Sequence, residues 1–311
     1  MTNSNFKEIY HMYDLIIIGG GPAGLTAGLY ARRGGLKTLI IESMVAGGQT
    51  NLTGEIENYP SIQSISGFEL SNNMLEQVTS LGVEFEYSEV TEINVVGDIK
   101  KVVTSDKAFE AKALILAMGA HPRQMGIEAE ESFVGRGVSY CAHCDGNFFK
   151  NKDVAVVGGG NTALQDALYL SNICKTVYLI HRRDEFRGNK ILSDKLAEKS
   201  NIVLKLNCIP QDILGEIQVK QLKIKNKVTN EVENLNVSGI FVAVGMSPNS
   251  GLVAGKVEMD DSGFIITDEN MLTNKKLVYA VGDIRQKPLR QVITACADGA
   301  TAAADAISRI D

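Results

Sequence analysis

This 311-residue sequence lacks the usual signals of a secreted, membrane-bound or nucleic-acid-binding protein. Five cysteines are too few, and odd in number, for a framework of structural disulfides. No apolar run reaches the roughly 18 residues that a membrane-spanning helix needs. The formal net charge of −6 argues against a nucleic-acid partner, because a phosphate backbone favours a basic surface. The polar segment 1–11 has no apolar core of a signal peptide, so we expect a cytoplasmic protein.

The bulk composition is that of an ordinary globular protein. Hydrophobic residues make up 44% of the chain and charged residues 22%, and the length suggests about two domains. There is no low-complexity tract and no proline-rich linker. Three cysteines, Cys174, Cys208 and Cys296, stand alone in the sequence, and we expect them to be small buried apolar residues.

A βαβ unit with a glycine-rich turn opens the chain. A buried strand is predicted over residues 14–18, a helix over 22–33 and a second strand over 38–41. The turn reads Gly19-Gly20-Gly21-Pro22-Ala23-Gly24 and fits G-x-G-x-x-G, in which glycines let the backbone approach a pyrophosphate at a helix N-terminus. Glu42 ends the second strand, where a carboxylate can bind ribose hydroxyls. The unit therefore predicts a dinucleotide site.

The same pattern returns later with a different ending. A strand over 153–157, the turn Gly158-Gly159-Gly160-Asn161-Thr162-Ala163, a helix over 161–171 and a strand over 177–180 form a second βαβ unit. The residues that follow are His181-Arg182-Arg183-Asp184-Glu185-Phe186-Arg187. Guanidinium groups bind a 2′-phosphate that a carboxylate would repel, so this site should prefer NADPH over NADH. The alternative is a solvated basic loop. The predicted NADPH-binding residues are Gly158, Gly160, Asn161, Thr162, Ala163, His181, Arg182, Arg183 and Arg187.

The order of these units predicts that one domain is inserted into the other. Two similar strand-plus-glycine segments, 113–119 and 240–245, flank the second unit. We therefore predict an α/β protein with two Rossmann-like nucleotide-binding domains of three layers (ββα). The first would comprise residues 1–120 and 248–311, and the second residues 121–247.

A closely spaced cysteine pair precedes the second glycine-rich turn, in Cys141-Ala142-His143-Cys144-Asp145-Gly146. Zinc normally needs four ligands, and no second pair exists, so we expect no metal. A purely structural disulfide is disfavoured in a reducing cytosol, which leaves a reversible redox pair as the better interpretation. Asp145 could exchange the thiol proton. His143 could tune the thiols or simply face solvent, and the sequence does not decide between these.

Together these motifs resemble the low-molecular-weight, bacterial-type thioredoxin reductases. The resemblance runs from residue 14 to residue 311 and also includes Gly47-Gly48-Gln49-Thr50, Gly282-Asp283-Ile284-Arg285 and Pro288-Leu289-Arg290-Gln291-Val292. It implies an FAD domain made of the N- and C-terminal parts and an inserted NADPH domain that carries the cysteine pair. It also implies a homodimer, an NADPH domain that rotates between two positions, and thioredoxin or a similar small dithiol protein as partner.

The resemblance also implies roles for individual residues. Cys144 would face the flavin, Cys141 would attack the thioredoxin disulfide, and Asp145 would act as acid–base. Arg182, Arg183 and Arg187 would hold the 2′-phosphate. The residues assigned to FAD are Gly19, Gly21, Pro22, Ala23, Gly24, Glu42, Gly48, Gln49, Thr50, Asn58, Val90, Ala117, Gly119, Gly282, Asp283, Arg290, Gln291 and Val292.

Three residues depart from the family pattern. His143 occupies a place where threonine is frequent, and Gln165 and Asp166 stand where relatives often carry two glutamates. The main alternative is a ferredoxin-dependent flavin thioredoxin reductase, which would lack the arginine cluster. A ferredoxin reductase of this fold would lack the cysteine pair, and an alkyl-hydroperoxide type would need an additional N-terminal module. A non-catalytic nucleotide sensor would not need the cysteine pair.

Overall fold

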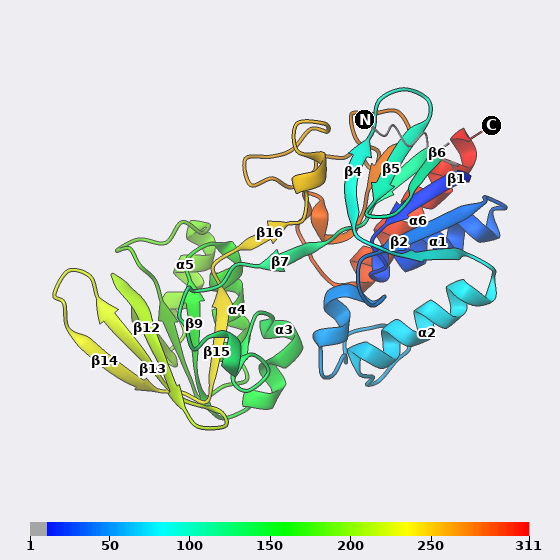
Figure 1. Cartoon of the computed structure of the whole chain (residues 1–311). Helices are drawn as coiled ribbons and strands as arrows, with labels where there is room; N and C mark the ends of the chain where they lie inside the picture. The colour runs from blue at the N-terminus through cyan, green and yellow to red at the C-terminus, as the bar shows by residue number, and fades with distance from the viewer. Residues whose placement is uncertain (1–10, 311) are drawn as a thin grey trace, which may run out of the picture. The chain divides into compact units, whose positions relative to one another are not determined.

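A computed structural model describes residues 11–310 of the chain. The chain divides into two compact units, one made of Met1–His121 and Ser247–Asp311 and the other of Pro122–Met246. The first unit is therefore discontinuous in sequence, and Figure 1 shows the chain leaving it and returning to it.

A mixed sheet forms the centre of the first unit. Its strand order is β3-β2-β1-β6-β5-β4, with β17 also paired to β6. β1, β2, β3, β6 and β17 run parallel, whereas β4, β5 and β6 form an antiparallel meander. The strands are β1 (His11–Ile18), β2 (Thr38–Glu42), β3 (Glu84–Tyr87), β4 (Val90–Asn94), β5 (Lys100–Thr104), β6 (Ala108–Leu116) and β17 (Val278–Ala280).

The apolar strand β1 is buried on both faces of this sheet, as a continuous apolar run predicts. Leu15 and Ile17 join a core with the helices, while Ile16 and Ile18 join a second core with β4 and β5. The helical segments are α1 (Pro22–Arg33), η1 (Gly48–Leu52), α2 (Gly67–Ser80), η4 (Gly251–Val253), η5 (Gly282–Ile284) and α6 (Val292–Arg309). Helices α1 and α6 approach closely at Gly299, where a Cβ atom would overlap the carbonyl oxygen of Ala23.

Three layers make up the second unit. A parallel sheet of order β11-β10-β9-β15-β8 lies between helix α4 on one face and a three-stranded antiparallel sheet, β12-β13-β14, on the other. The strands are β8 (Val138–Ser139), β9 (Asp153–Gly158), β10 (Thr176–Ile180), β11 (Ile202–Lys205), β12 (Cys208–Gly215), β13 (Val219–Asn226), β14 (Val232–Asn236) and β15 (Gly239–Ala243). The helical segments are η2 (Glu131–Phe133), α3 (Ala142–Asp145), η3 (Gly146–Phe149), α4 (Asn161–Ser171) and α5 (Lys190–Ala197).

Two short strands connect the units. β7 (Ala120–Pro122) pairs with β16 (Met246–Pro248), and a glycine with positive φ stands near each, Gly119 at 66° and Gly245 at 115°. The predicted α/β class with two Rossmann-like halves is confirmed. The predicted helices over 22–33 and 161–171 are confirmed as α1 and α4.

Candidate active site

The first glycine-rich turn has two tightly packed glycines and one open glycine. Gly19 has φ +104°, and a Cβ there would overlap the carbonyl oxygen of Ala117 at the end of β6. A Cβ at Gly24 would overlap the carbonyl oxygen of Gly19. Gly21, the N-cap of α1, has φ −73°, and among the described residues beyond its two chain neighbours no atom lies within 4 Å of its virtual Cβ. The turn therefore leaves open space beside a helix start that has no side-chain cap, as an anion cradle requires.

Glu42 reinforces this turn from the end of β2. Its Oε2 accepts a hydrogen bond from the Gly20 N–H at 2.7 Å, and its Oε1 accepts one from the Met44 N–H at 3.0 Å. The sequence placed this carboxylate near the nucleotide ribose. The structure adds that its first role is local, because it fixes the middle of the glycine-rich turn.

Buried polar atoms near η5 support the presence of a ligand in the first unit. Asp283 Oδ1 and Arg290 Nε are buried and have no hydrogen-bond partner among residues 11–310. Burial raises the pKa of Asp283, and the charges of Lys287 and Arg290 oppose this rise. The Arg290 guanidinium lies 4.2 Å from the Phe264 ring centroid. A ligand rich in hydroxyl groups would supply the partner that Asp283 lacks, so these residues fit the ribityl chain of FAD.

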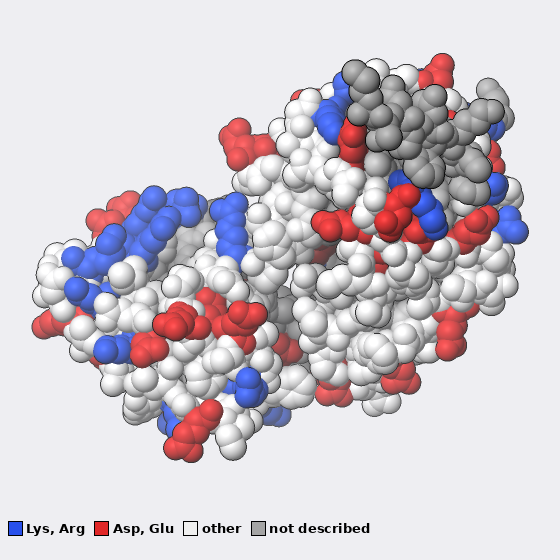
Figure 2. All heavy atoms as spheres, in the orientation of Figure 1, with Lys and Arg blue, Asp and Glu red and all other residues white. Residues whose placement is uncertain are grey.

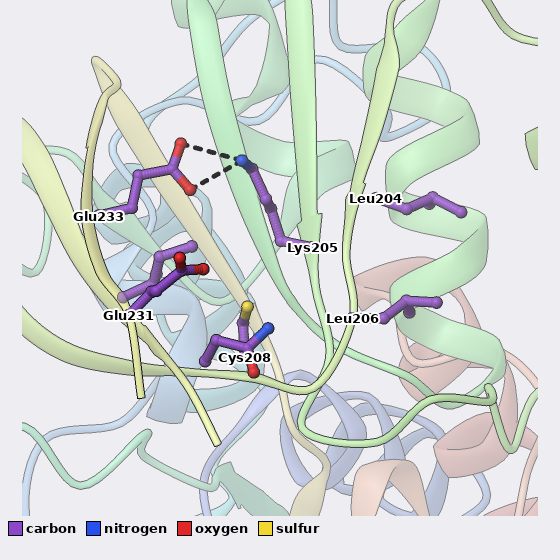
Figure 3. Close-up of a pocket in the computed structure, with 8 residues that line it drawn as sticks. Leu204, Lys205, Leu206, Cys208, Glu231 and Glu233 are labelled. Atoms are coloured by element: carbon purple, nitrogen blue, oxygen red, sulfur yellow. Dashed lines mark hydrogen bonds and ion pairs between the residues drawn. The ribbon is translucent and has the colours of Figure 1, made fainter. Parts of the chain in front are cut away.

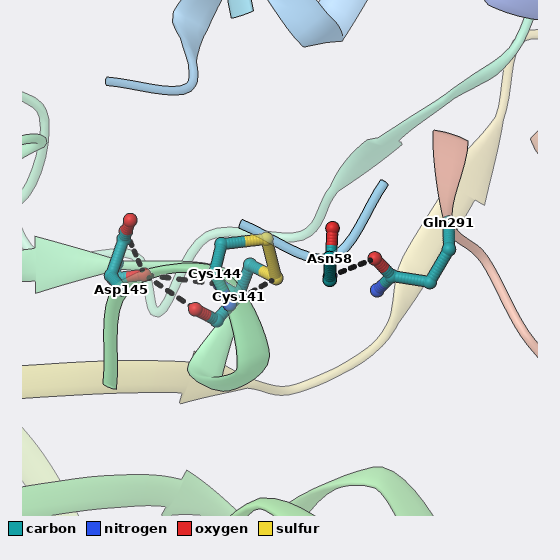
Figure 4. Close-up of a disulfide and its surroundings, with 6 residues drawn as sticks. Asn58, Cys141, Cys144, Asp145 and Gln291 are labelled. Atoms are coloured by element: carbon teal, nitrogen blue, oxygen red, sulfur yellow. Dashed lines mark hydrogen bonds between the residues drawn. A yellow bond between two sulfur atoms is a disulfide. The ribbon is translucent and has the colours of Figure 1, made fainter. Parts of the chain in front are cut away.

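Other residues assigned to FAD gather in the same unit. Gly48 begins η1, and its virtual Cβ lies 3.5 Å from the Cα of Gly21. Asn58 Nδ2 donates to Gln291 Oε1 at 3.0 Å, which joins residues that are distant in sequence (Figure 4). Gln49 is exposed, whereas the side chain of Val90 is buried in the sheet core, so only its backbone is available to a ligand.

The remaining members of this set also lie in the first unit. Thr50 is buried in η1, and the N–H of Asn249 donates to the carbonyl oxygen of Gly119 at 3.0 Å. Gly282 has φ +73°, and its virtual Cβ lies 3.0 Å from the Cβ of Ala23. Val292 is the first residue of α6.

The second glycine-rich turn repeats the first. A Cβ at Gly158 would overlap the carbonyl oxygen of Ala243 at the end of β15 and would lie 2.7 Å from the Cβ of Ala163. Gly160 is the N-cap of α4, has no side-chain cap, and leaves open space around its virtual Cβ. Each unit thus carries one open cradle at a helix start.

The arginine-rich loop after β10 is held against this second turn. The Arg187 N–H donates to the Gly159 carbonyl oxygen at 2.8 Å, and the Asn189 N–H donates to Asn161 Oδ1 at 2.7 Å. His181 is buried, and its ring fills the space where a Cβ of Gly159 would stand. Its Nε2 lies 3.1 Å from the Glu185 carbonyl oxygen, and burial lowers its pKa. His181 and Asn161 therefore support the loop from beneath.

The guanidinium groups of this loop face solvent. Arg182, Arg183 and Arg187 are all exposed. Figure 2 shows that Lys and Arg side chains gather along one edge of the second unit. The same unit carries no carboxylate directly after β10, where Glu42 stands in the first unit. This local charge suits a phosphorylated nucleotide.

Cys141 and Cys144 form a disulfide at the start of α3 (Figure 4). Their Cα atoms are 5.3 Å apart, within the usual range for a disulfide. Cys141 is the N-cap of this short helix, and the Cys144 N–H donates to its Sγ at 3.2 Å. An N–H donor in this position favours negative charge on the sulfur that it faces.

Ser139 is a residue of the site that sequence reasoning missed. Its hydroxyl donates to Asp145 Oδ2 at 2.7 Å, and its Oγ accepts from the Cys141 N–H at 3.1 Å. Ser139 is buried, and it links the acidic residue to the backbone of the first cysteine. The sequence motif S-x-C-x-x-C-D contained this signal, because a serine two residues before a turn commonly caps it. The exposed His143 ring packs on Tyr169, with centroids 4.1 Å apart.

Other parts of the described chain offer no comparable site. Cys174, Cys208 and Cys296 are buried, as predicted. Within residues 11–310, no three His, Cys, Asp or Glu side chains gather as a metal site would require, and no helix is long and apolar enough to cross a membrane. A depression of about 230 Å³ is lined by β11–β14 residues (Figure 3). Lys205 and Glu233 form an ion pair at its edge, at 2.8 Å.

Comparison with known proteins defines the class. The profile of the pyridine nucleotide-disulphide oxidoreductase family matches residues 13–299. A thioredoxin reductase of Peptoclostridium acidaminophilum is 43% identical over 95% of this chain and 96% of its own length. One of Treponema pallidum is 43% identical over 96% and 97%. The crystal structure of thioredoxin reductase from Streptococcus pyogenes is 44% identical, covers 96% and 97% of the two chains, and superimposes with a TM-score of 0.88.

The chain therefore belongs to the pyridine nucleotide-disulphide oxidoreductase family. It is an oxidoreductase and a flavoprotein, and its cofactors are FAD and NADPH. The resemblance to the low-molecular-weight thioredoxin reductases is confirmed.

Proposed function

We propose that this protein is an NADPH-dependent thioredoxin-disulfide reductase whose reducing equivalents reach thioredoxin through Cys141 and Cys144. One observation carries the proposal: a single chain holds two open helix-start cradles and one disulfide made by a C-x-x-C. Neither a nucleotide sensor nor a ferredoxin reductase has a use for the disulfide. Relatives at 43% identity over nearly the full chain support the same function.

The two cradles would bind different nucleotides. We assign FAD to the discontinuous unit, because it supplies Glu42 and the buried Asp283 Oδ1, which has no hydrogen-bond partner among residues 11–310. We assign NADPH to the inserted unit, because exposed arginines follow β10 and no carboxylate stands at the end of that strand, where Glu42 stands in the first unit. When bound, the nicotinamide supplies hydride and the flavin passes the electrons to the disulfide. The protein contributes binding, orientation and thiol chemistry.

The reduced cysteines would carry out dithiol–disulfide exchange. The Cys141 thiolate attacks one sulfur of the thioredoxin disulfide, and the other thioredoxin sulfur leaves as a thiolate and is protonated. The Cys144 thiolate then attacks Cys141 Sγ, which releases the second thioredoxin thiol. The Cys141–Cys144 disulfide is restored, and two electrons and two protons have passed to thioredoxin.

Asp145 would exchange the protons of this reaction. Its Oδ2 accepts a hydrogen bond from Ser139, and the Ser139 hydroxyl in turn contacts the backbone of Cys141. The carboxylate is therefore held in one orientation close to the cysteine turn. A positioned carboxylate of this kind contributes a rate factor of about 10² to 10⁴ in general acid–base catalysis.

Three further features belong to the same proposal. The glycines beside β7 and β16 support a rotation of the inserted unit, because positive-φ glycines adopt alternative backbone conformations with little strain. We also propose a cytoplasmic homodimer. The partner would be thioredoxin or a similar small dithiol protein.

A spectroscopic titration tests the proposal. The purified protein should be yellow, and NADPH alone should bleach the flavin absorbance near neutral pH, whereas NADH at equal concentration should do so far more slowly. Adding thioredoxin with NADPH should then release thiols at one dithiol per NADPH consumed. Bleaching by reduced ferredoxin but not by NADPH would support the ferredoxin-dependent alternative. A reducible flavin without turnover of any dithiol protein would contradict the proposal.

A further inference from the structure

A buried charge network surrounds η5, the segment that carries Asp283. Asp298 lies in α6, and its Oδ2 accepts hydrogen bonds from the Gly282 N–H at 3.0 Å and from Lys287 Nζ at 2.7 Å. Its Oδ1 lies 3.4 Å from Arg285 Nη1. The Lys287 side chain is only 3% exposed and that of Asp298 only 9%. Burial at this level excludes the water that weakens a surface ion pair.

The packing of α6 on α1 places Asp298 at this position. The residue after it is Gly299, which meets the backbone of Ala23 so closely that a side chain would overlap it. Ala23 in turn contacts Gly282, whose virtual Cβ lies 3.0 Å from the Ala23 Cβ. Asp298 is therefore fixed beneath the first residue of η5. The same contacts fix the position of η5 relative to the glycine-rich turn.

Lys287 has two acidic groups within its electrostatic reach. Its ammonium group shares an acceptor oxygen with the Gly282 N–H, so it lies beside the residue that precedes Asp283. Its charge acts on Asp283 and opposes the rise in that carboxyl's pKa. In the structure, however, the ammonium donates to Asp298, and no described residue hydrogen-bonds Asp283 Oδ1.

We propose that Asp298 is a positioning residue for FAD: it holds Lys287, so that the Asp283 carboxylate remains free to accept hydrogen bonds from the ribityl hydroxyls. Without the Asp298 charge, the buried ammonium would be unpaired, and Asp283 is the nearby carboxylate that would satisfy it. The ligand would then have to break a buried ion pair before it could bind. This inference rests on the proposed FAD site in the first unit.

The test is a second-site rescue measured as flavin affinity. Flavin release from the full-length holoprotein on dilution, followed by the rise in flavin fluorescence, gives the dissociation constant at pH 8. Asp298→Asn should weaken FAD binding by about tenfold or more, since one hydrogen bond to a charged acceptor is exchanged for an internal ion pair. Lys287→Met in the Asp298→Asn background should restore the affinity to within about threefold of wild type, because the ammonium that competes for Asp283 is removed.

Asp305→Asn is the matched control. Asp305 lies on the same helix and also has two polar partners, Tyr279 at 2.8 Å and Arg309 at 2.7 Å, but none of these contacts η5 directly. Its FAD affinity should equal that of wild type. A general weakening of α6 would instead lower the affinity of both variants and would not be rescued by the change at Lys287.

Each outcome is decisive. Asp298→Asn with wild-type FAD affinity, or a double variant as weak as Asp298→Asn, overturns the inference. If Asp298→Asn alone does not fold, the double variant, which leaves no buried ammonium without a partner, carries the test and must bind FAD within about threefold of wild type. If wild-type protein binds no FAD at all, the proposed function fails. If wild-type protein binds FAD but the Asp298 variants do not show the expected affinities, only the inference about Asp298 fails.

Discussion

The paired open glycines Gly21 and Gly160 give the sharpest prediction. Each is the N-cap of a helix and has φ of −73° or −93°. Within residues 11–310, and apart from its two chain neighbours, each has no atom within 4 Å of its virtual Cβ. Alanine adopts these dihedral angles without strain. Gly→Ala at such a site reduces the entropy of the unfolded chain and stabilises a protein by about 0.4–1 kcal/mol. Neither substitution should therefore lower the stability of the protein without nucleotides.

Ligand binding should respond differently. If a pyrophosphate contacts the backbone at Gly21, the new methyl group occupies its place, and overpacking of this kind costs about 1–3 kcal/mol, or about 5- to 150-fold in affinity. Gly21→Ala should weaken FAD binding by this amount and leave the KM for NADPH nearly unchanged. Gly160→Ala should raise the KM for NADPH and leave FAD bound. Each variant is thus the control for the other.

The assay combines two measurements. Flavin release on dilution reports FAD affinity, and the thermal midpoint of the deflavinated protein reports stability. Gly19→Ala is the contrasting case, because Gly19 has φ +104° and no room for a Cβ, so this substitution should lower the midpoint itself. Wild-type FAD affinity in Gly21→Ala would refute a contact between Gly21 and the pyrophosphate. A fall in the thermal midpoint of Gly21→Ala as large as that of Gly19→Ala would also refute it.

Three other predictions follow from the site and the core. Cys144→Ser should still be bleached by NADPH but should lose thioredoxin reduction by at least about a thousandfold in a coupled turnover assay, and normal turnover would contradict the exchange mechanism. Arg183→Gln should raise the KM for NADPH by about tenfold and leave that for NADH unchanged, and an equal change for both would argue against a 2′-phosphate contact. Burial raises the pKa of Asp166 to about 7. The neutral acid is thus favoured in the folded state, and its contribution to stability falls as pH rises from about 4 to about 7. Asp166→Asn should therefore gain stability over wild type, and denaturant unfolding should show that gain growing by about 2–3 kcal/mol between pH 5 and pH 8.

Local patterns were sufficient to predict the secondary elements near the cradles. An apolar strand, a glycine-rich turn and a helix start follow one another within a few residues, so short-range backbone constraints specify α1 and α4. The C-x-x-C spacing likewise brings the two cysteines close enough to form a disulfide that closes a small ring. The three isolated cysteines are buried, in line with the general behaviour of free cysteine as a small apolar residue.

Hydrogen-bond partners that are distant in the sequence could not be predicted from local patterns. Asn58 and Gln291 are brought together only by the tertiary fold, and the same is true of Asp298 and Gly282. His181 lies in a basic run that predicts contact with phosphate, yet the structure buries its ring under Gly159. A one-dimensional pattern gives the type and spacing of side chains, but not which face of an element becomes covered.

The sequence by itself determined the chemistry of this protein: two nucleotide cradles, a basic loop and a redox pair, each encoded within a dozen adjacent residues. The tertiary structure alone decided which carboxylates are satisfied and which remain free, because that depends on helix packing between distant segments. Asp283 and Asp298 are the same residue type, and the sequence alone does not distinguish them. Only the close approach of α6 to α1 pairs Asp298 with two cations and leaves Asp283 with a buried oxygen that has no partner in the described chain.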